Sequence, residues 1–404
     1  MKNFLWKSLD REIKSSNLSN FEKYLSENYQ TSFKNNYEKI WNWSIENSAE
    51  FWKSIWKFSN VKGKLGKKLF IKSKIFYKNK FLPDSSLNFS ENILKKNDDS
   101  KAVTFISENG YREIRSWKDL KINTIKVSNW LKKNNIKKND RVAAYLPNCI
   151  ETIEAYLGTI AIGAIWSSCS PDFGVKGIIE RFSQINPKVL FICRKYFYNG
   201  KEIDVLSRSQ EILKEIPSVK FLVIVNYPGE DKEKNYLSIS NVKTLYWKEI
   251  LKKPTKKFNF ELFEFDHPLV ILYSSGTTGK PKCICHRAGG VLLQHIKELS
   301  LHSNIKANDN VFYFTTCGWM MWNWLVSALL CNASIVLFDG FPMYKKDDLL
   351  IDICNKEKIT LFGISAKYID TLKKKKINAI KKYSLDNLKT ICSTGSPLSV
   401  DGFN

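Results

Sequence analysis

The sequence predicts an α/β fold built on parallel β-sheets. Short apolar runs of strand length recur from about Ala102 onward, and several alternate with segments whose apolar residues have helical spacing. This alternation is typical of βαβ units, in which a helix connects two parallel strands. The chain has 404 residues, 43% of them hydrophobic, which is enough for two or three domains with a sizeable core.

The N-terminal region has a different character from the rest of the chain. It is rich in Trp, Phe, Tyr, Lys and Asn, and its aromatic residues are spaced as in helices that pack on a larger body. The aromatic residues with this spacing are Trp41, Trp43, Phe51, Trp52, Trp56 and Phe58. We therefore predict a helical N-terminal cap over residues 1–100 and a larger α/β domain over residues 101–404.

Within the larger domain, a strand is predicted over residues 142–146, and a helix after it, because Ile150, Ile153 and Leu157 recur at helical spacing. Further runs of strand length cover residues 189–193, 221–225, 269–273, 311–315, 334–338, 360–364 and 388–392. The last run precedes a loop at 393–397 and a segment with the turn and cap residues of a helix start. We expect this strand and helix to lack partners, as in a polypeptide truncated at its carboxyl end.

A formal net charge of +24 raises the question of a nucleic-acid or anionic-membrane partner. The lysines are scattered from end to end, however, and no nucleic-acid-binding motif accompanies them. We therefore predict ordinary solvated faces, with neither a nucleic acid nor a membrane as partner.

The sequence also predicts a cytoplasmic protein. Its start has no apolar segment of signal-peptide length, and the apolar stretch at 155–166 is shorter than the roughly 20 residues that span a bilayer. Nine cysteines without a secretory signal predict free thiols in a reducing compartment. Only Cys283 and Cys285 lie close together, and their spacing is not that of a metal site, so we predict no metal-ligating cluster.

One short stretch carries clear chemistry, YSSGTTGKPK at residues 273–282, directly after the apolar run 269–272. Ligands of open α/β folds bind where parallel strands end, and glycines there let the backbone approach an anion closely. Hydroxyl groups, backbone N–H groups and lysines can then surround anionic oxygens, so we predict a polyphosphate ligand. The residues expected around the phosphates are Ser274, Ser275, Gly276, Thr277, Thr278, Gly279, Lys280 and Lys282.

This phosphate loop (residues 274–282) is not a Walker A motif. Gly276 and Gly279 are only three positions apart, and Pro281 follows Lys280 where Ser or Thr is required. A P-loop ATPase is therefore disfavoured. The alternative is a surface turn that is rich in Gly, Ser and Thr and carries chance lysines.

The stretch resembles the phosphate loop of the adenylate-forming superfamily, which includes acyl-CoA synthetases, luciferases and the adenylation domains of peptide synthetases. Segments at 163–174, 316–323 and 393–398 resemble the acetoacetate-activating branch of that superfamily in particular. The resemblance covers the whole chain but only the front part of the superfamily's length. It implies the large N-terminal domain of the adenylate-forming fold, incomplete at its carboxyl end.

The resemblance also implies roles for individual residues in ATP binding. The phosphate loop matches the segment that holds the β- and γ-phosphates of ATP. Gly395, Ser396 and Pro397 match the loop that lies along the adenine.

A second set of matching residues concerns the acyl group and coenzyme A. Trp319 lies in the segment that lines the acyl pocket and the passage to coenzyme A, Trp322 lies near it, and Lys201 matches a position that could meet a coenzyme A phosphate. Alternatives stay open for all three. Tryptophans in a strand-to-helix turn are often core residues, and a lysine is often simply solvated.

The implied reaction is an acid–thiol ligation in two steps, with acetoacetate, Mg²⁺-ATP and coenzyme A as substrates. The carboxylate displaces pyrophosphate from ATP to give an acyl adenylate, and the thiol then displaces AMP. No protein nucleophile is needed, because positioning and charge stabilisation carry such chemistry. The chain indeed shows no Ser-His-Asp or Cys-His constellation.

The superfamily's magnesium-binding acid, its ribose-binding aspartate and its catalytic lysine all match positions beyond Asn404, so no catalytic residue is assigned. Loss of one oriented charge costs on the order of 10²-fold in rate, so we expect this chain alone to be a poor catalyst or none. An unpaired apolar sheet edge is also expected. The alternatives are a nucleotide-binding remnant without turnover, a ligase for another short-chain acid, and a polyanion-binding protein.

Overall fold

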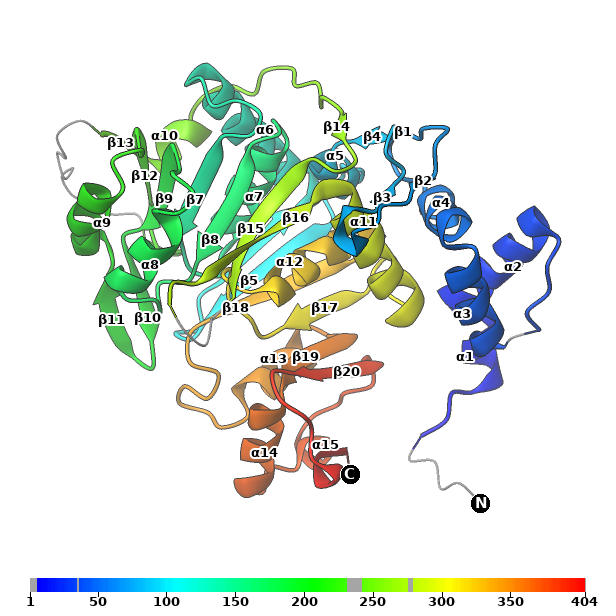
Figure 1. The fold of residues 1–404 in the computed structure, drawn as a ribbon. Coiled ribbons are helices and arrows are strands. Elements are labelled where there is room, and N and C mark those ends of the chain that lie inside the picture. The colour runs from blue at the N-terminus through cyan, green and yellow to red at the C-terminus, as the bar shows by residue number, and fades with distance from the viewer. Residues whose placement is uncertain (1–5, 35, 231–241, 275–278, 404) are drawn as a thin grey trace.

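The structure is a computed structural model that describes residues 6–34, 36–230, 242–274 and 279–403. Two large, mostly parallel sheets form its centre, with helices packed around them (Figure 1). This arrangement confirms the predicted α/β class.

The first sheet has seven strands in the order β13-β12-β9-β7-β8-β15-β16. All neighbours are parallel except β15 and β16, which form an antiparallel pair. The strands are β7 (Arg141–Tyr145), β8 (Ile165–Cys169), β9 (Val189–Cys193), β12 (Phe221–Val225), β13 (Lys243–Tyr246), β15 (Pro268–Ser274) and β16 (Lys282–Arg287). Every residue of β8 and β9 is buried, as expected for strands covered on both faces.

The second sheet has six strands in the order β20-β19-β17-β18-β5-β6, and only β6 is antiparallel to its neighbour. The strands are β5 (Lys101–Ser107), β6 (Arg112–Ser116), β17 (Asn310–Tyr313), β18 (Ser334–Asp339), β19 (Leu361–Ser365) and β20 (Thr390–Thr394). All eight strands predicted from apolar runs are present in the two sheets, with ends within two residues of the prediction.

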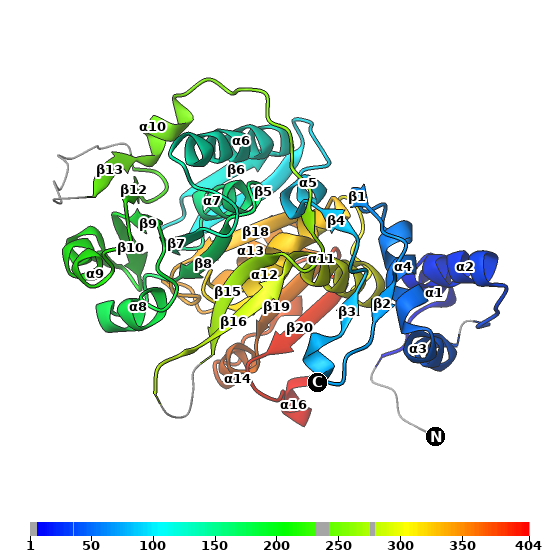
Figure 2. The same ribbon diagram turned by 45° about the horizontal axis from the view of Figure 1, so that its top comes forward.

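Helices α6 and α7 pack against each other, and Figure 2 shows them side by side. Helix α7 is the one predicted after β7, and ten of its eleven residues are buried. The helices of the larger domain are α6 (Trp117–Lys133), α7 (Ile150–Ile160), α8 (Val175–Phe182), η2 (Leu206–Arg208), α9 (Ser209–Glu215), α10 (Trp247–Leu251), α11 (Ala288–Ile296), the π-helix η3 (Lys297–His302), α12 (Met320–Ser327), η4 (Ala328–Cys331), α13 (Leu349–Lys356), α14 (Ala366–Lys374), α15 (Ala379–Lys382) and α16 (Val400–Phe403).

The N-terminal helices predicted from the aromatic spacing are confirmed. The aromatic residues with that spacing lie in α3 (Tyr37–Glu46) and α4 (Ser48–Phe58), and two further helices, α1 (Asp10–Lys14) and α2 (Asn17–Tyr29), precede them. Asn17, at the start of α2, bonds to the backbone within and just after the π-helix η3, since its Nδ2 donates to Ser300 O at 3.1 Å and to Ile305 O at 2.9 Å. These bonds attach the N-terminal helices to η3.

The helical prediction is wrong between α4 and the short helix α5 (Phe89–Ile93), where the chain forms short strands and one 3₁₀ turn. The elements are β1 (Gly63–Lys64), β2 (Phe70–Ile71), η1 (Phe76–Lys78), β3 (Lys80–Phe81) and β4 (Ser86–Leu87). Strand β4 lies between β1 and the distant β14 (Phe263–Glu264) in a three-stranded antiparallel sheet. Such pairing depends on contacts far along the chain, which local spacing does not reveal.

The carboxyl end also differs from expectation. Strand β20 has a partner, because it pairs in parallel with β19, and α16 contacts α14. On its other side β20 has no neighbouring strand within the described residues, and its Ile391 is 59% exposed. The predicted unpaired edge is therefore present, with Ile391 as its exposed apolar residue, whereas the predicted lack of any partner is wrong.

Two further sequence expectations concern the chain as a whole. All nine cysteines are free thiols, as predicted. Across the described ranges, no helix combines the length and the apolar character needed to cross a bilayer.

Candidate functional site

The carboxyl ends of strands from both large sheets meet at Asn148, which follows β7 and is 1% exposed. Its Nδ2 donates to Thr315 O, after β17, at 3.2 Å and to Phe338 O, in β18, at 3.3 Å. Its backbone N–H donates to Asp339 Oδ1 at 3.2 Å. Asn148 thus joins the strand ends at which open α/β folds bind their ligands.

A second link ties β8 to the turn that precedes α12. Ser168 Oγ donates to Cys317 O at 2.6 Å, and Cys317 Sγ donates to Leu146 O at 3.0 Å. Since Cys317 and Ser168 are fully buried or nearly so, this turn is held from the side of the seven-stranded sheet.

The described part of the phosphate loop lies where the sequence predicted it, at the carboxyl end of β15. Ser274 ends β15 and pairs in register with Lys282, the first residue of β16. Lys280 and Lys282 are exposed, and Gly279 has a φ of 88° that only glycine adopts without strain. The predicted contacts of Ser275, Gly276, Thr277 and Thr278 lie outside the described residues.

The predicted adenine loop follows β20 in the six-stranded sheet. Gly395, Ser396 and Pro397 are all exposed there. The two predicted ATP-binding loops therefore belong to different sheets, each at the carboxyl end of a parallel strand.

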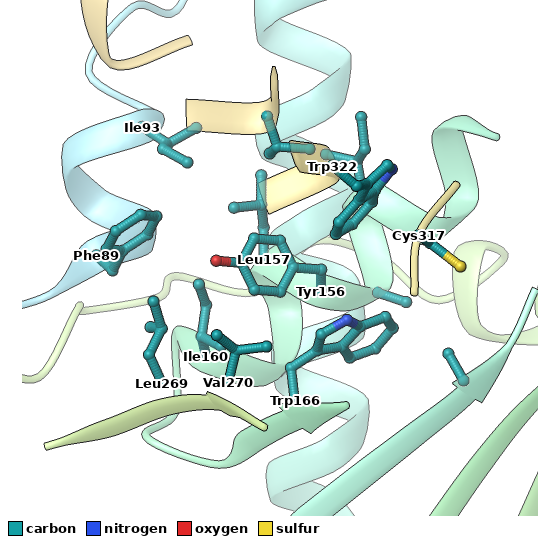
Figure 3. Packing of buried hydrophobic residues seen from close by; sticks show 14 of the residues in the cluster. Phe89, Ile93, Tyr156, Leu157, Ile160, Trp166, Leu269, Val270, Cys317 and Trp322 are labelled. Atoms are coloured by element: carbon teal, nitrogen blue, oxygen red, sulfur yellow. The ribbon is translucent and has the colours of Figure 1, made fainter. Parts of the chain in front are cut away.

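The two tryptophans of the predicted acyl segment have different surroundings. Trp319, at the start of α12, is 55% exposed. Trp322 is fully buried, its ring centre is 5.6 Å from that of Tyr156, and its Nε1 donates to Asn148 Oδ1 at 2.9 Å. Figure 3 shows Trp322 facing Tyr156 in the core cluster. This favours the alternative left open for Trp322, a core residue, and leaves Trp319 available to a ligand.

Lys201 begins the second strand of a hairpin formed by β10 (Lys195–Tyr198) and β11 (Lys201–Asp204). It is exposed, and the turn before it consists of Asn199 and Gly200, which have φ angles of 52° and 75°. Asn-Gly with two positive φ angles is typical of a tight hairpin turn.

The polar residues that hold these parts together were not among the predicted site residues. Asn148 and Asp339 each follow a predicted strand, and that position was the signal available for them. Glu108 follows β5, which no prediction included, and its carboxylate accepts backbone N–H groups of the hairpin turn.

Asp339 is 8% exposed, and burial raises its pKa to about 7, although the Asn148 N–H and the Tyr227 hydroxyl act in the opposite direction. Because the folded-state pKa lies above the ordinary 3.8, the folded protein holds this proton, and stability falls as pH rises from about 4 to 7.

We therefore expect Asp339→Asn to flatten the pH dependence of stability. The melting temperature of the wild type should fall more between pH 5.5 and pH 8 than that of the variant. The exposed Asp347→Asn is the matched control and should follow the wild type. Parallel curves for all three proteins would show that Asp339 ionises as freely in the folded state as in the unfolded chain.

Comparisons with known proteins agree with this architecture. The family described as AMP-binding enzyme matches residues 89–402. Acetoacetyl-coenzyme A synthetase of Rhizobium meliloti (strain 1021) is 39% identical over 401 residues, and acetoacetyl-CoA synthetase of Gallus gallus is 39% identical over 376 residues. These alignments cover 98% and 91% of this chain.

A solved structure, acetoacetyl-CoA synthetase from Streptomyces lividans, superposes with a TM-score of 0.92 at 31% identity and covers 99% of this chain. The chain spans only part of each relative, namely 60% of the Rhizobium protein, 56% of the Gallus protein and 61% of the Streptomyces chain. The fold is therefore that of the N-terminal part of an adenylate-forming enzyme. Because the family match covers more than half of its residues, this chain belongs to the AMP-binding enzyme family.

Proposed function

We propose that this chain is the ATP-binding part of an acid–CoA ligase that acts on acetoacetate. The observation that carries the proposal is the start of β16, beside the end of β15, where Gly279 has a left-handed φ of 88° and Lys280 and Lys282 stand exposed. Exposed lysines beside a glycine with positive φ, next to the end of a parallel strand, suit the phosphates of a nucleotide. The names of the similar proteins support acetoacetate as the acid.

The first step of the proposed reaction activates the acid. A carboxylate oxygen of acetoacetate attacks the α-phosphorus of ATP, the bond to the β-phosphate oxygen breaks, and pyrophosphate leaves. We propose that the phosphate loop holds the departing β- and γ-phosphates through Ser274, Lys280 and Lys282, and that residues 395–397 lie along the adenine. Lysine charge near the departing phosphates would stabilise the charge that develops on them.

The second step transfers the acyl group. The sulfur of coenzyme A, after losing its proton, attacks the carbonyl carbon of the adenylate, and AMP leaves. We propose that the exposed Trp319 lines the path of the acyl group and that Lys201 meets a phosphate of coenzyme A. The Trp322 N–H donates to Trp319 O at 3.1 Å, and the Trp322 side chain is anchored in the core by its bond to Asn148.

We propose that Mg²⁺ enters together with ATP. Within the described residues, no group of three or more His, Cys, Asp or Glu side chains is placed to hold a metal ion. No residue is therefore assigned to Mg²⁺.

The domain boundaries, the partners and the cellular compartment are also proposals. We propose a cap over residues 1–100 and an adenylation domain over residues 101–404, and small molecules as the only partners, without nucleic acid or membrane. The nine free thiols support a reducing, cytoplasmic setting.

Lys280→Ala combined with Gly279→Ala is expected to weaken ATP binding at least about tenfold, because a charge-assisted contact is worth about 1.5–3 kcal/mol. Isothermal titration calorimetry with ATP on the full chain measures this effect. The exposed Lys253→Ala is the control and should bind as the wild type does. Unchanged affinity in the double variant would move the phosphate site away from this loop.

The choice of acid has its own test. Pyrophosphate release with ATP should be faster with acetoacetate than with acetate if this chain, alone or with the remainder that its relatives possess, activates acetoacetate. Equal use of several fatty acids would overturn that choice, and ATP binding without any release would favour a nucleotide-binding protein.

A further inference from the structure

Glu108 is a buried carboxylate whose hydrogen-bond donors come from the backbone. It is 7% exposed, and its Oε2 accepts the N–H groups of Asn199 and Phe341, each at 2.8 Å. Its Oε1 accepts the N–H of Gly200, also at 2.8 Å. Among the described residues, no Lys, Arg or His side chain forms an ion pair with Glu108. Burial of a charge without a counter-ion costs free energy, and the hydrogen bonds from the three N–H groups offset that cost.

The donors belong to two loops that the chain brings together from different sheets. Asn199 and Gly200 form the turn of the β10–β11 hairpin, which follows β9 of the seven-stranded sheet (Figure 1). Phe341 lies after β18 of the six-stranded sheet, and the Glu108 N–H itself donates to Asp339 O at 2.9 Å. Glu108 therefore fastens the hairpin to the other sheet, at the carboxyl ends of its strands.

Packing around the turn shows how closely the hairpin is held. A Cβ added to Gly200 would lie 3.0 Å from the Tyr344 ring. The Tyr198 ring meets Phe341 edge-on, with 5.7 Å between ring centres. A two-stranded hairpin is marginally stable alone, so its orientation depends on contacts such as these.

Lys201 follows directly after the fastened turn and is exposed. We propose that Glu108 is a positioning residue, which fixes the β10–β11 hairpin so that Lys201 meets a phosphate of coenzyme A. This inference rests on the proposed function, because it deepens the role given there to Lys201. Glu108 itself is buried behind the turn and touches no substrate in this proposal.

Glu108→Gln is the sharpest test, because it keeps the side chain's shape but replaces one acceptor oxygen by an NH₂ group that faces an N–H donor. Glu357→Gln is the matched control, since Glu357 is also a buried carboxylate beside the six-stranded sheet, but its partners are Arg112 and Lys101. Calorimetry on the full chain, with coenzyme A and with ATP separately, would compare both variants with the wild type. Amide hydrogen exchange would follow Asn199, Gly200 and Phe341.

We expect Glu108→Gln to weaken coenzyme A binding about tenfold, to leave ATP affinity within about twofold, and to accelerate exchange at the three amides. Glu357→Gln should lower stability without these effects. If Glu108 acts through Lys201, the double variant Glu108→Gln/Lys201→Ala should bind coenzyme A no more weakly than Lys201→Ala alone.

Results that would overturn the positioning role of Glu108 differ from those that would remove the proposed function. Undiminished coenzyme A affinity in Glu108→Gln, additive losses in the double variant, or equal losses for ATP and coenzyme A would overturn the positioning role. A wild type that binds ATP but not coenzyme A would also overturn it and would leave the nucleotide site standing. A wild type that binds neither would remove the proposed function, and this inference with it.

Discussion

At pH 9, replacing Arg115 by methionine is expected to lower the free energy of unfolding by about 3–5 kcal/mol, because it leaves a buried carboxylate without its counter-ion. Arg115, in β6, lies with its Nε 2.9 Å from Glu154 Oε1 and its Nη2 3.0 Å from Glu113 Oε1. Glu154 is fully buried in α7, and the close approach of Arg115 is an ion pair without hydrogen-bond geometry. Glu151 adds further negative charge nearby.

The loss should depend on pH in a definite direction. Burial raises the pKa of Glu154 from 4.5 to about 8, while Arg115 acts to lower it. The folded state therefore holds the proton, and stability falls as pH rises from about 4.5 through 8. Without Arg115 the pKa rises further, so Arg115→Met should be more destabilised at pH 9 than at pH 6.

Urea unfolding of the full chain at the two pH values measures both effects. The double variant Arg115→Met/Glu154→Gln should recover much of the lost stability, because the buried carboxylate closest to Arg115 is then gone as well. Equal deficits at both pH values, without recovery in the double variant, would mean that Glu154 is neutral in the folded protein whatever its neighbour.

The parts of the fold that could be predicted were those with a local signal. Residues 189–193 and 221–225 are unbroken apolar runs, and they form β9 and β12 with the predicted ends because central parallel strands are buried on both faces. Strand β16 gave no such signal, since its residues are mostly exposed on a sheet edge. The short strands between α4 and α5 depend on pairing with β14, far along the chain.

For the candidate site too, only the residues with a local sequence signal could be predicted. The phosphate loop could be recognised because its chemistry lies within one short stretch of sequence. Whether Trp322 lines a pocket or belongs to the core depends on Tyr156 and Asn148, which only the folded chain brings to it. Glu108 reads as an ordinary turn residue, because its partners lie 91 and 233 positions away.

Asn148→Asp should destabilise the junction between the two sheets by about 3 kcal/mol or more, because each orphaned polar group costs about 1–3 kcal/mol and a buried charge costs more. A carboxylate cannot donate to Thr315 O or Phe338 O, so it would set oxygen against oxygen at both contacts. It would also place a second carboxyl group beside that of Asp339, which the Asn148 backbone already contacts. Urea unfolding of the full chain measures the loss.

Two comparison variants separate charge from lost hydrogen bonds at this junction. Asn148→Ala removes the same donors and leaves Trp322 Nε1 without its acceptor, but it adds no charge. Asn148→Asp should therefore be the less stable of the two, with a gap that widens as pH rises and the new carboxyl ionises. Asn129→Asp, at an exposed amide that contacts Lys256 O, should cost little. If Asn148→Asp unfolds no more easily than Asn129→Asp, then packing around Trp322 and Tyr156 holds the two sheets together without the amide.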